Sequence, residues 1–127
     1  MNIDKELDKI FADDPMGILC LNPYERLKDV KSSIKLLETL RNEGFEIPNI
    51  NETIDQLYVY SEYLVNNIRF ACGQQDIAYV NTVIPILSDL GILFSEEKEG
   101  CNHVVIAGIY ISMPDYYRLE EFLKHLN

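Results

Sequence analysis

The chain has 127 residues, 47% of them hydrophobic and 25% charged, a composition that predicts one ordinary globular domain over residues 1–127. Its net charge of -10 disfavours nucleic acid and anionic membranes as partners, because binding to either depends on exposed Lys and Arg. There is neither an apolar run of about 18 residues nor a signal-peptide pattern, so we expect a cytoplasmic protein that does not span a membrane.

Helices are expected to fill the first part of the chain, residues 1–75. A short helix over residues 3–11 should stop at Asp13-Asp14-Pro15, and residues 16–21 read as an apolar connector. A second helix is clearly delimited, because Asn22 can cap it, Pro23 suits its first turn and Gly44 suits its C-terminal end. Its apolar residues recur at spacings of three and four: Leu27, Val30, Ile34, Leu37 and Leu40.

A third helix is predicted over residues 52–72 and should pair with the second as an antiparallel helical hairpin. Its apolar stripe consists of Ile54, Leu57, Ser61, Leu64, Ile68 and Cys72. Tyr60 and Tyr63 fall outside this stripe, so we expect them to form an exposed aromatic patch.

The remaining part, residues 76–127, reads as helix, β-hairpin, helix. Asp76 caps the first of these helices, and Pro85 should kink it or split it near Val83. Residues 92–94 and 103–111 are the expected strands, joined by a turn at residues 96–100, and Ser112 begins the last helix. The predicted fold class is therefore α+β and mainly helical, with a helical hairpin packed on a winged-helix-like helix, β-hairpin, helix unit.

The sequence offers little that could support catalysis. Cys20, Cys72 and Cys101 are widely spaced and fit core packing better than disulfides or a metal site. Cys101 and His103 are the one closely spaced pair, His125 lies at the far end of the chain, and no zinc or phosphate-binding motif is present. We expect no enzymatic activity, no metal and no cofactor.

A helix followed by a two-stranded wing often belongs to a nucleic-acid reader, but the charge here is wrong for that role. Residues 76–90 contain no Lys or Arg, and the expected tip carries Glu96, Glu97 and Glu99 against a single lysine. The helix at residues 76–90 offers no positive charge to a phosphate backbone, and the glutamates of the hairpin tip would repel it. Direct nucleic-acid binding is therefore not expected.

The combination of acidic surface and abundant tyrosine favours a non-enzymatic protein-binding module that docks on a basic partner surface. Inhibitors, immunity proteins and mimics of nucleic-acid charge act in this way. The candidate partner-binding residues are Glu96, Glu97 and Glu99 for electrostatic steering, with Tyr60 and Tyr63 as aromatic anchors. Two alternatives remain: a homo-oligomeric regulatory or scaffold module, for example a homodimer, and a small-ligand-binding domain near Cys101, His103 and Tyr110.

Overall fold

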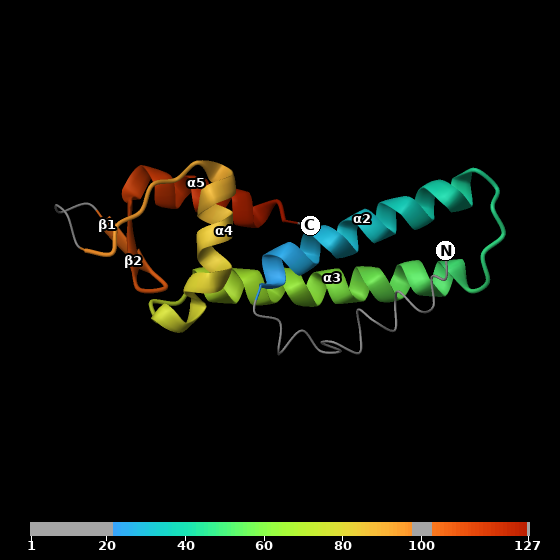
Figure 1. Ribbon diagram of the computed structural model, residues 1–127, viewed down its shortest axis with the longest axis horizontal. Helices are drawn as coiled ribbons and strands as arrows, with labels where there is room; N and C mark the ends of the chain where they lie inside the picture. Colours follow the sequence, from blue (N-terminus) through green and yellow to red (C-terminus); the bar gives the residue numbers. More distant parts are fainter. Residues whose placement is uncertain (1–21, 98–102, 127) are drawn as a thin grey trace. The chain divides into compact units, whose positions relative to one another are not determined.

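The computed structural model describes residues 22–97 and 103–126 (Figure 1). The expected helix at 3–11, the connector at 16–21, and Cys20, Glu99 and Cys101 lie outside the described residues. Within the described ranges the fold class is confirmed: the chain is mainly helical, with a small two-stranded antiparallel sheet. The winged-helix likeness stays a prediction. In the same ranges, no helix combines the length and apolarity that a bilayer crossing requires.

The chain divides into two compact units, unit 1 (Met1–Leu64) and unit 2 (Val65–Asn127). Unit 1 begins with helix α2, Pro23–Asn42. The Asn22 side chain accepts a hydrogen bond from the Glu25 N–H at 3.2 Å, as the predicted cap requires. At the other end Gly44 has a φ of +86°, and the Phe45 N–H returns to the Leu40 carbonyl at 3.1 Å. Both predicted ends of this helix are confirmed.

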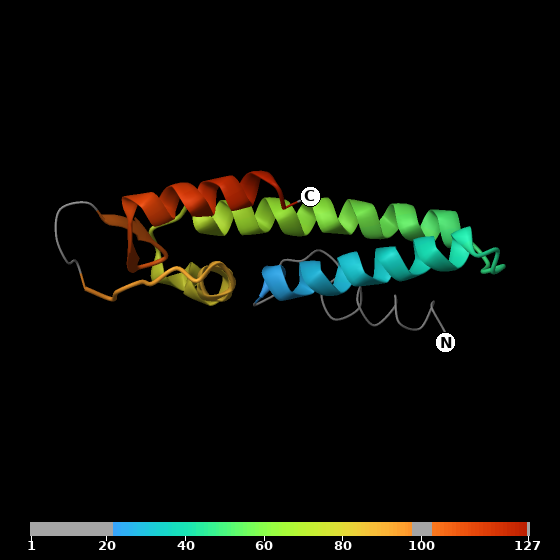
Figure 2. The same cartoon turned by 90° about the horizontal axis from the view of Figure 1, so that it is seen from above.

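Helix α3, Ile50–Cys72, lies antiparallel to α2 within unit 1 (Figures 1 and 2). Two polar contacts join the helical pair at its surface. The Tyr58 hydroxyl donates to the Glu38 carboxylate at 2.5 Å, and the Arg41 guanidinium donates to Asn51 at 3.0 Å. The Glu38 carboxylate, as hydrogen-bond acceptor, raises the pKa of Tyr58. Beneath these contacts lie fully apolar positions of both helices: Leu27, Val30, Ile34, Leu37, Ile54, Leu57 and Leu64.

Unit 2 contains the end of α3, a short 3-10 helix η1 (Ile77–Tyr79), helix α4 (Val80–Leu90), strands β1 (His103–Ile106) and β2 (Ile109–Ser112), and helix α5 (Met113–Lys124). The Asp76 side chain accepts a hydrogen bond from the Ala78 N–H at 2.9 Å. It therefore caps η1, whereas the prediction had it capping the longer helix that follows, α4. Helix α4 runs unbroken through Pro85, so the expected split near Val83 is wrong. Proline removes a single ladder bond, and the burial of Val83, Ile86 and Leu87 holds the helix together around it.

The β-hairpin differs from the prediction. Residues 103–111 are not one return strand, because β1 and β2 pair with each other in antiparallel register, Val104 opposite Ile111 and Ile106 opposite Ile109. The chain reverses at Ala107 (φ 51°) and Gly108 (φ 76°), the left-handed pair that a two-residue hairpin turn demands. Residues 92–94 form no strand, and Ser95 alone pairs with Tyr110, on the side of β2 that faces away from β1.

The hairpin turn is docked on the loop that follows α3. The Ala107 N–H donates to the Gln74 carbonyl and the Gly108 N–H to the Gln75 carbonyl, both at 2.8 Å. Turn N–H groups that would otherwise face water thereby bond to a segment some thirty residues earlier in the sequence. This docking, with the buried Ile106, Ile109 and Ile111, holds the hairpin against the helices of unit 2.

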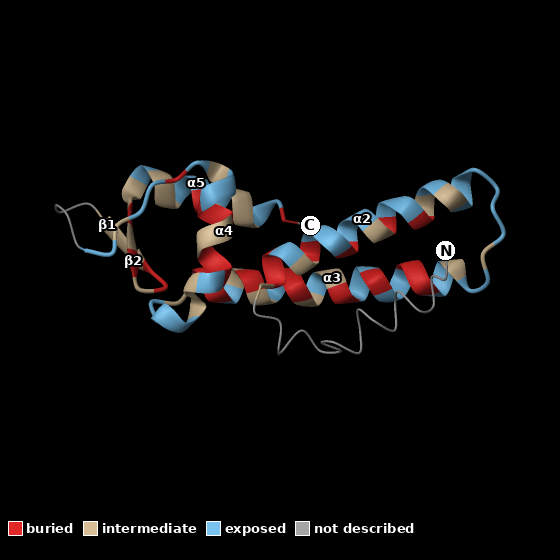
Figure 3. Ribbon diagram, viewed as in Figure 1, coloured by how far each residue is buried: buried red, intermediate tan, exposed pale blue. Residues whose placement is uncertain are grey.

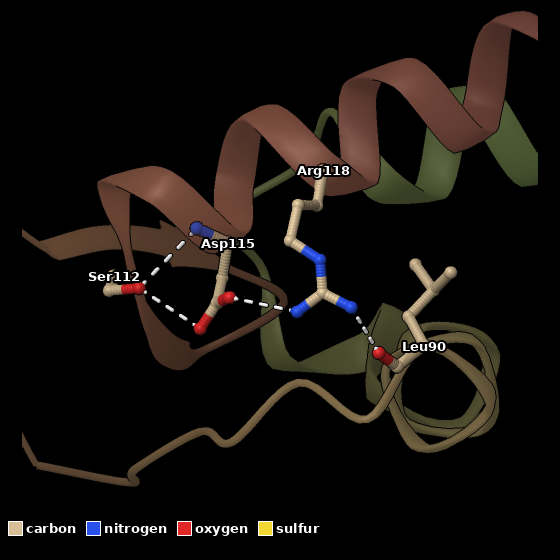
Figure 4. Close-up of polar contacts among 4 residues, drawn as sticks. All are labelled: Leu90, Ser112, Asp115 and Arg118. Atoms are coloured by element: carbon tan, nitrogen blue, oxygen red, sulfur yellow. Dashed lines mark hydrogen bonds and ion pairs between the residues drawn. The ribbon is translucent and has the colours of Figure 1, made fainter.

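Helix α5 starts at a polar cluster that also binds the end of α4 (Figure 4). The Ser112 hydroxyl accepts from the Asp115 N–H at 3.4 Å and donates to the Asp115 carboxylate at 3.0 Å. Arg118 donates to the same carboxylate at 3.2 Å and to the Leu90 carbonyl at 2.6 Å. The predicted start of this helix is confirmed, and its capping residues hold the arginine that reaches α4.

Replacing Ser112 by alanine is expected to lower the free energy of unfolding by about 1 kcal/mol, because the first turn of α5 loses its cap and Asp115 loses a donor. The measurement is urea unfolding followed by circular dichroism. Ser32→Ala is the matched control, since Ser32 is exposed in the middle of α2. Equal stability of the two variants would contradict the assigned role of Ser112.

Candidate functional site

The predicted partner-binding residues fall in different units. Glu96 and Glu97 are exposed in unit 2, just after the Ser95 bridge, and Glu99 lies outside the described residues. Tyr60 and Tyr63 belong to α3 in unit 1.

The expectation that Tyr60 is exposed is wrong, because its side chain is only 4% exposed. The buried face of α3 is broader than the stripe read from the sequence and includes Tyr60 and Val65, while Tyr58 beside it is exposed. A side chain with so little surface offers a partner almost no contact area. Tyr63 is half-buried, and its anchoring role stays a prediction.

Next to the glutamates lie two exposed apolar side chains that the sequence pattern did not reveal. Leu93 is 86% exposed and Phe94 is 41% exposed, and Figure 3 shows the coil after α4 to be largely exposed. The sequence predicts them to lie in a strand over residues 92–94, which the structure does not contain. The one signal that could have revealed them is the closeness of Gly91 to Ser95-Glu96-Glu97, which leaves too few residues for a strand. We call residues 93–97 the edge segment.

Leu93 and Phe94 are held on both sides. Gly91 adopts a left-handed φ of 68° at the end of α4, and the Ile92 N–H returns to the Leu87 carbonyl at 2.9 Å. Ile92 itself is buried, which anchors the chain before it becomes exposed. On the other side Ser95 exchanges two backbone hydrogen bonds with Tyr110, at 3.0 and 2.8 Å. The exposure of Leu93 and Phe94 is thus imposed by fixed neighbours.

The electrostatic surroundings of the edge segment are acidic. The described part of unit 2 carries seven acidic side chains and three basic ones. All three bases are engaged elsewhere: Arg69 donates to the Leu123 carbonyl at 2.9 Å, Arg118 binds Asp115 and Leu90, and Lys124 pairs with Glu121 at 3.8 Å. None of them contacts Glu96 or Glu97. The negative potential at the edge segment is therefore not neutralised by the described residues of its own unit.

Unit 1 has a different charge pattern, with basic residues concentrated on α2. This helix holds five basic residues against three acidic ones, and Lys28, Lys31 and Lys35 are exposed at spacings of three and four. Lys28 lies 4.5 Å from the Tyr24 ring centroid and 3.6 Å from the Glu25 carboxylate. The described part of unit 1 still carries eight acidic against five basic side chains, a net charge of -3 compared with -4 in unit 2. The two units therefore differ in where their bases lie, and not in net charge.

The histidines and the described cysteine show no arrangement for nucleophilic chemistry. His125 is exposed and lies 3.1 Å from the Glu121 carboxylate. His103 is half-buried, and its Nδ1 atom is buried without a hydrogen-bond partner. Burial raises the pKa of the Cys72 thiol to about 12, which keeps it protonated and unreactive at neutral pH. Among the described residues, no three His, Cys, Asp or Glu side chains lie close enough together to hold a metal ion.

No protein-family model, curated protein or solved structure matches the chain. The edge segment combines two exposed apolar side chains with two exposed carboxylates, and its backbone is anchored by Ile92 before it and by Ser95 within it.

Proposed function

We propose that the protein is a non-enzymatic binding module that docks on a basic surface of a protein partner through the edge segment. The observation that carries this proposal is the exposure of Leu93 and Phe94 directly before Glu96 and Glu97. Large apolar side chains on a soluble surface, rimmed by charge, are typical of interaction sites. An inhibitor, an immunity protein or a mimic of nucleic-acid charge would have this combination.

The proposed mechanism has two stages. Glu96 and Glu97, with no counter-charge from the described bases of unit 2, attract Lys and Arg on the partner and raise the association rate. Leu93 and Phe94 then lose their contact with water, and this burial slows dissociation. Full burial of a leucine side chain stabilises a complex by roughly 1.5–3 kcal/mol, which is enough to change the dissociation rate by tenfold or more.

The experiment is affinity capture from native lysate at low and high salt, followed by measurement of the association rate with the captured partner. We expect a partner of basic isoelectric point, released by salt, and an association rate about tenfold lower for Glu96→Lys/Glu97→Lys at low ionic strength. Glu43→Lys/Glu46→Lys is the control, because it makes the same charge change at exposed positions of unit 1.

An equal loss of association in both charge-reversed variants would show that only total charge matters and would contradict a role for the edge segment. Unchanged association and unchanged salt dependence in Glu96→Lys/Glu97→Lys would contradict the proposed function itself.

A further inference from the structure

The edge segment has an open backbone edge as well as exposed side chains. Ser95 directs its N–H and C=O toward Tyr110 of β2. In a trans peptide the C=O and the N–H that follows it point opposite ways, so the Phe94 C=O and the Glu96 N–H are directed away from β2. Within the described residues, the backbone N–H groups of Phe94 and Glu96 have no hydrogen-bond acceptor.

We infer that this open edge accepts an extended segment of the partner as an added β-strand, rich in Lys or Arg. The inference rests on the proposed function and specifies its geometry. Main-chain hydrogen bonds to Phe94 and Glu96 would supply part of the affinity, and basic side chains opposite Glu96 and Glu97 would supply the selectivity. Leu93 and Phe94 offer apolar contact on the two faces of the added strand.

The other edge of the small sheet is a poorer site for strand addition. At the turn end of β1, the Ala107 N–H is already bonded to the Gln74 carbonyl. The side chains of β1 are half-buried or buried, whereas Leu93 is almost fully exposed. Strand addition is therefore assigned to the side of β2 that carries Ser95.

Two features restrict which strand can bind. The Glu97 N–H donates to the Ser95 hydroxyl at 3.1 Å, which bends the chain and limits the open edge to a few residues. A second copy of this chain would bring Glu96 and Glu97 against the same residues of its partner, and like charges on neighbouring strands repel. Acidic side chains on an exposed edge also protect it against pairing between copies. The occupant that fits is a short, basic segment of another protein.

The test uses a fluorescent acetyl-Lys-Val-Lys-Val-Lys-Val-Lys-amide peptide at about 0.15 M salt, where weak long-range attraction is largely screened. Its control is the same peptide N-methylated on all internal amides. This modification keeps the charge and the side chains but removes the backbone N–H groups that would donate hydrogen bonds. We expect the unmodified peptide to bind at least fivefold more tightly, as measured by fluorescence anisotropy. We also expect it to slow amide hydrogen exchange at Phe94 and Glu96 at least fivefold, without a comparable change at Tyr58 of unit 1.

The substitutions Glu96→Lys/Glu97→Lys should weaken binding of the unmodified peptide at least fivefold. The control substitutions Glu43→Lys/Glu46→Lys should weaken its binding far less. Equal affinity for both peptides, with unchanged exchange at Phe94 and Glu96, would overturn strand addition while leaving an acidic docking surface intact. If no binding is seen up to about 1 mM peptide, the dissociation constant is weaker than that of most specific complexes, and strand addition is also overturned. Binding that survives Glu96→Lys/Glu97→Lys unchanged would overturn the proposed function together with the inference.

Discussion

Replacing Gly108 by alanine is expected to lower the free energy of unfolding by about 3 kcal/mol, from backbone strain plus overpacking. Gly108 has a φ of +76°, a backbone conformation that residues other than glycine rarely adopt. An added Cβ would also lie 2.6 Å from Ile77 Cδ1 and 3.2 Å from Ile77 Cα. The new methyl group must either displace η1 or break the bond between the Gly108 N–H and the Gln75 carbonyl. Urea unfolding, with the slope as well as the midpoint recorded, measures the loss.

Gly44→Ala separates the two causes, because Gly44 has a similar φ of +86° but no atom within 4 Å of an added Cβ. We expect a loss of about 1 kcal/mol there, from strain alone. Ile77→Ala removes the closest contacting atom and should reduce the cost of Gly108→Ala by about 1 kcal/mol, since the overpacking is partly relieved. If Gly108→Ala is no more destabilising than Gly44→Ala, the close approach of η1 to the hairpin turn is wrong.

Alkaline pH is expected to destabilise the protein through Cys72, whose pKa burial raises from 9.0 to about 12. The unfolded chain releases the thiol proton near its ordinary pKa, while the folded protein retains it. The contribution of the neutral thiol is therefore fully present below pH 9 and is lost as the pH rises toward 12. Above pH 9 the loss is about 1.4 kcal/mol per pH unit, hence roughly 2 kcal/mol at pH 10.5.

The measurement compares unfolding free energies at pH 8 and pH 10.5 with those of Cys72→Ala, with Cys20 and Cys101 replaced by serine in both proteins. Tyrosine and lysine titrations are common to the two proteins and cancel in the difference. The stability advantage of Cys72 over alanine at pH 8 should shrink by roughly 2 kcal/mol at pH 10.5. If the stability advantage of Cys72 over alanine stays constant over this pH range, the thiol is hydrated. That outcome would contradict the burial of Cys72, whose exposed fraction is 4%.

The ends of the helices could be read from the sequence. Asn22, Gly44 and Ser112 each act within a few residues of their position, through a side-chain cap or a left-handed φ. Such local bonds depend only on neighbouring residues, so the local pattern is enough to predict them. The apolar stripe of α2 was readable for the same reason, because helical periodicity places Leu27, Val30 and Ile34 on one face.

The β-hairpin and the candidate site were not readable in this way. An apolar run from residue 103 to 111 fits one buried strand as well as two short strands. The reversal at Gly108 is selected by docking on Gln74, Gln75 and Ile77, which are distant in the sequence. Tyr60 was misplaced for a related reason, because the width of the buried face of α3 depends on what packs against it.

The sequence by itself determined the mainly helical class, the two ends of α2, the start of α5 and the acidic charge, because these follow from composition, period and capping over short spans. Only the tertiary structure decided that Tyr60 is buried, that Leu93 and Phe94 are exposed, and that the chain turns at residues 107 and 108. Those outcomes depend on contacts between segments that lie far apart in the chain. The proposed binding edge exists because one such contact, between Ser95 and Tyr110, places two apolar residues and two glutamates at the margin of the sheet.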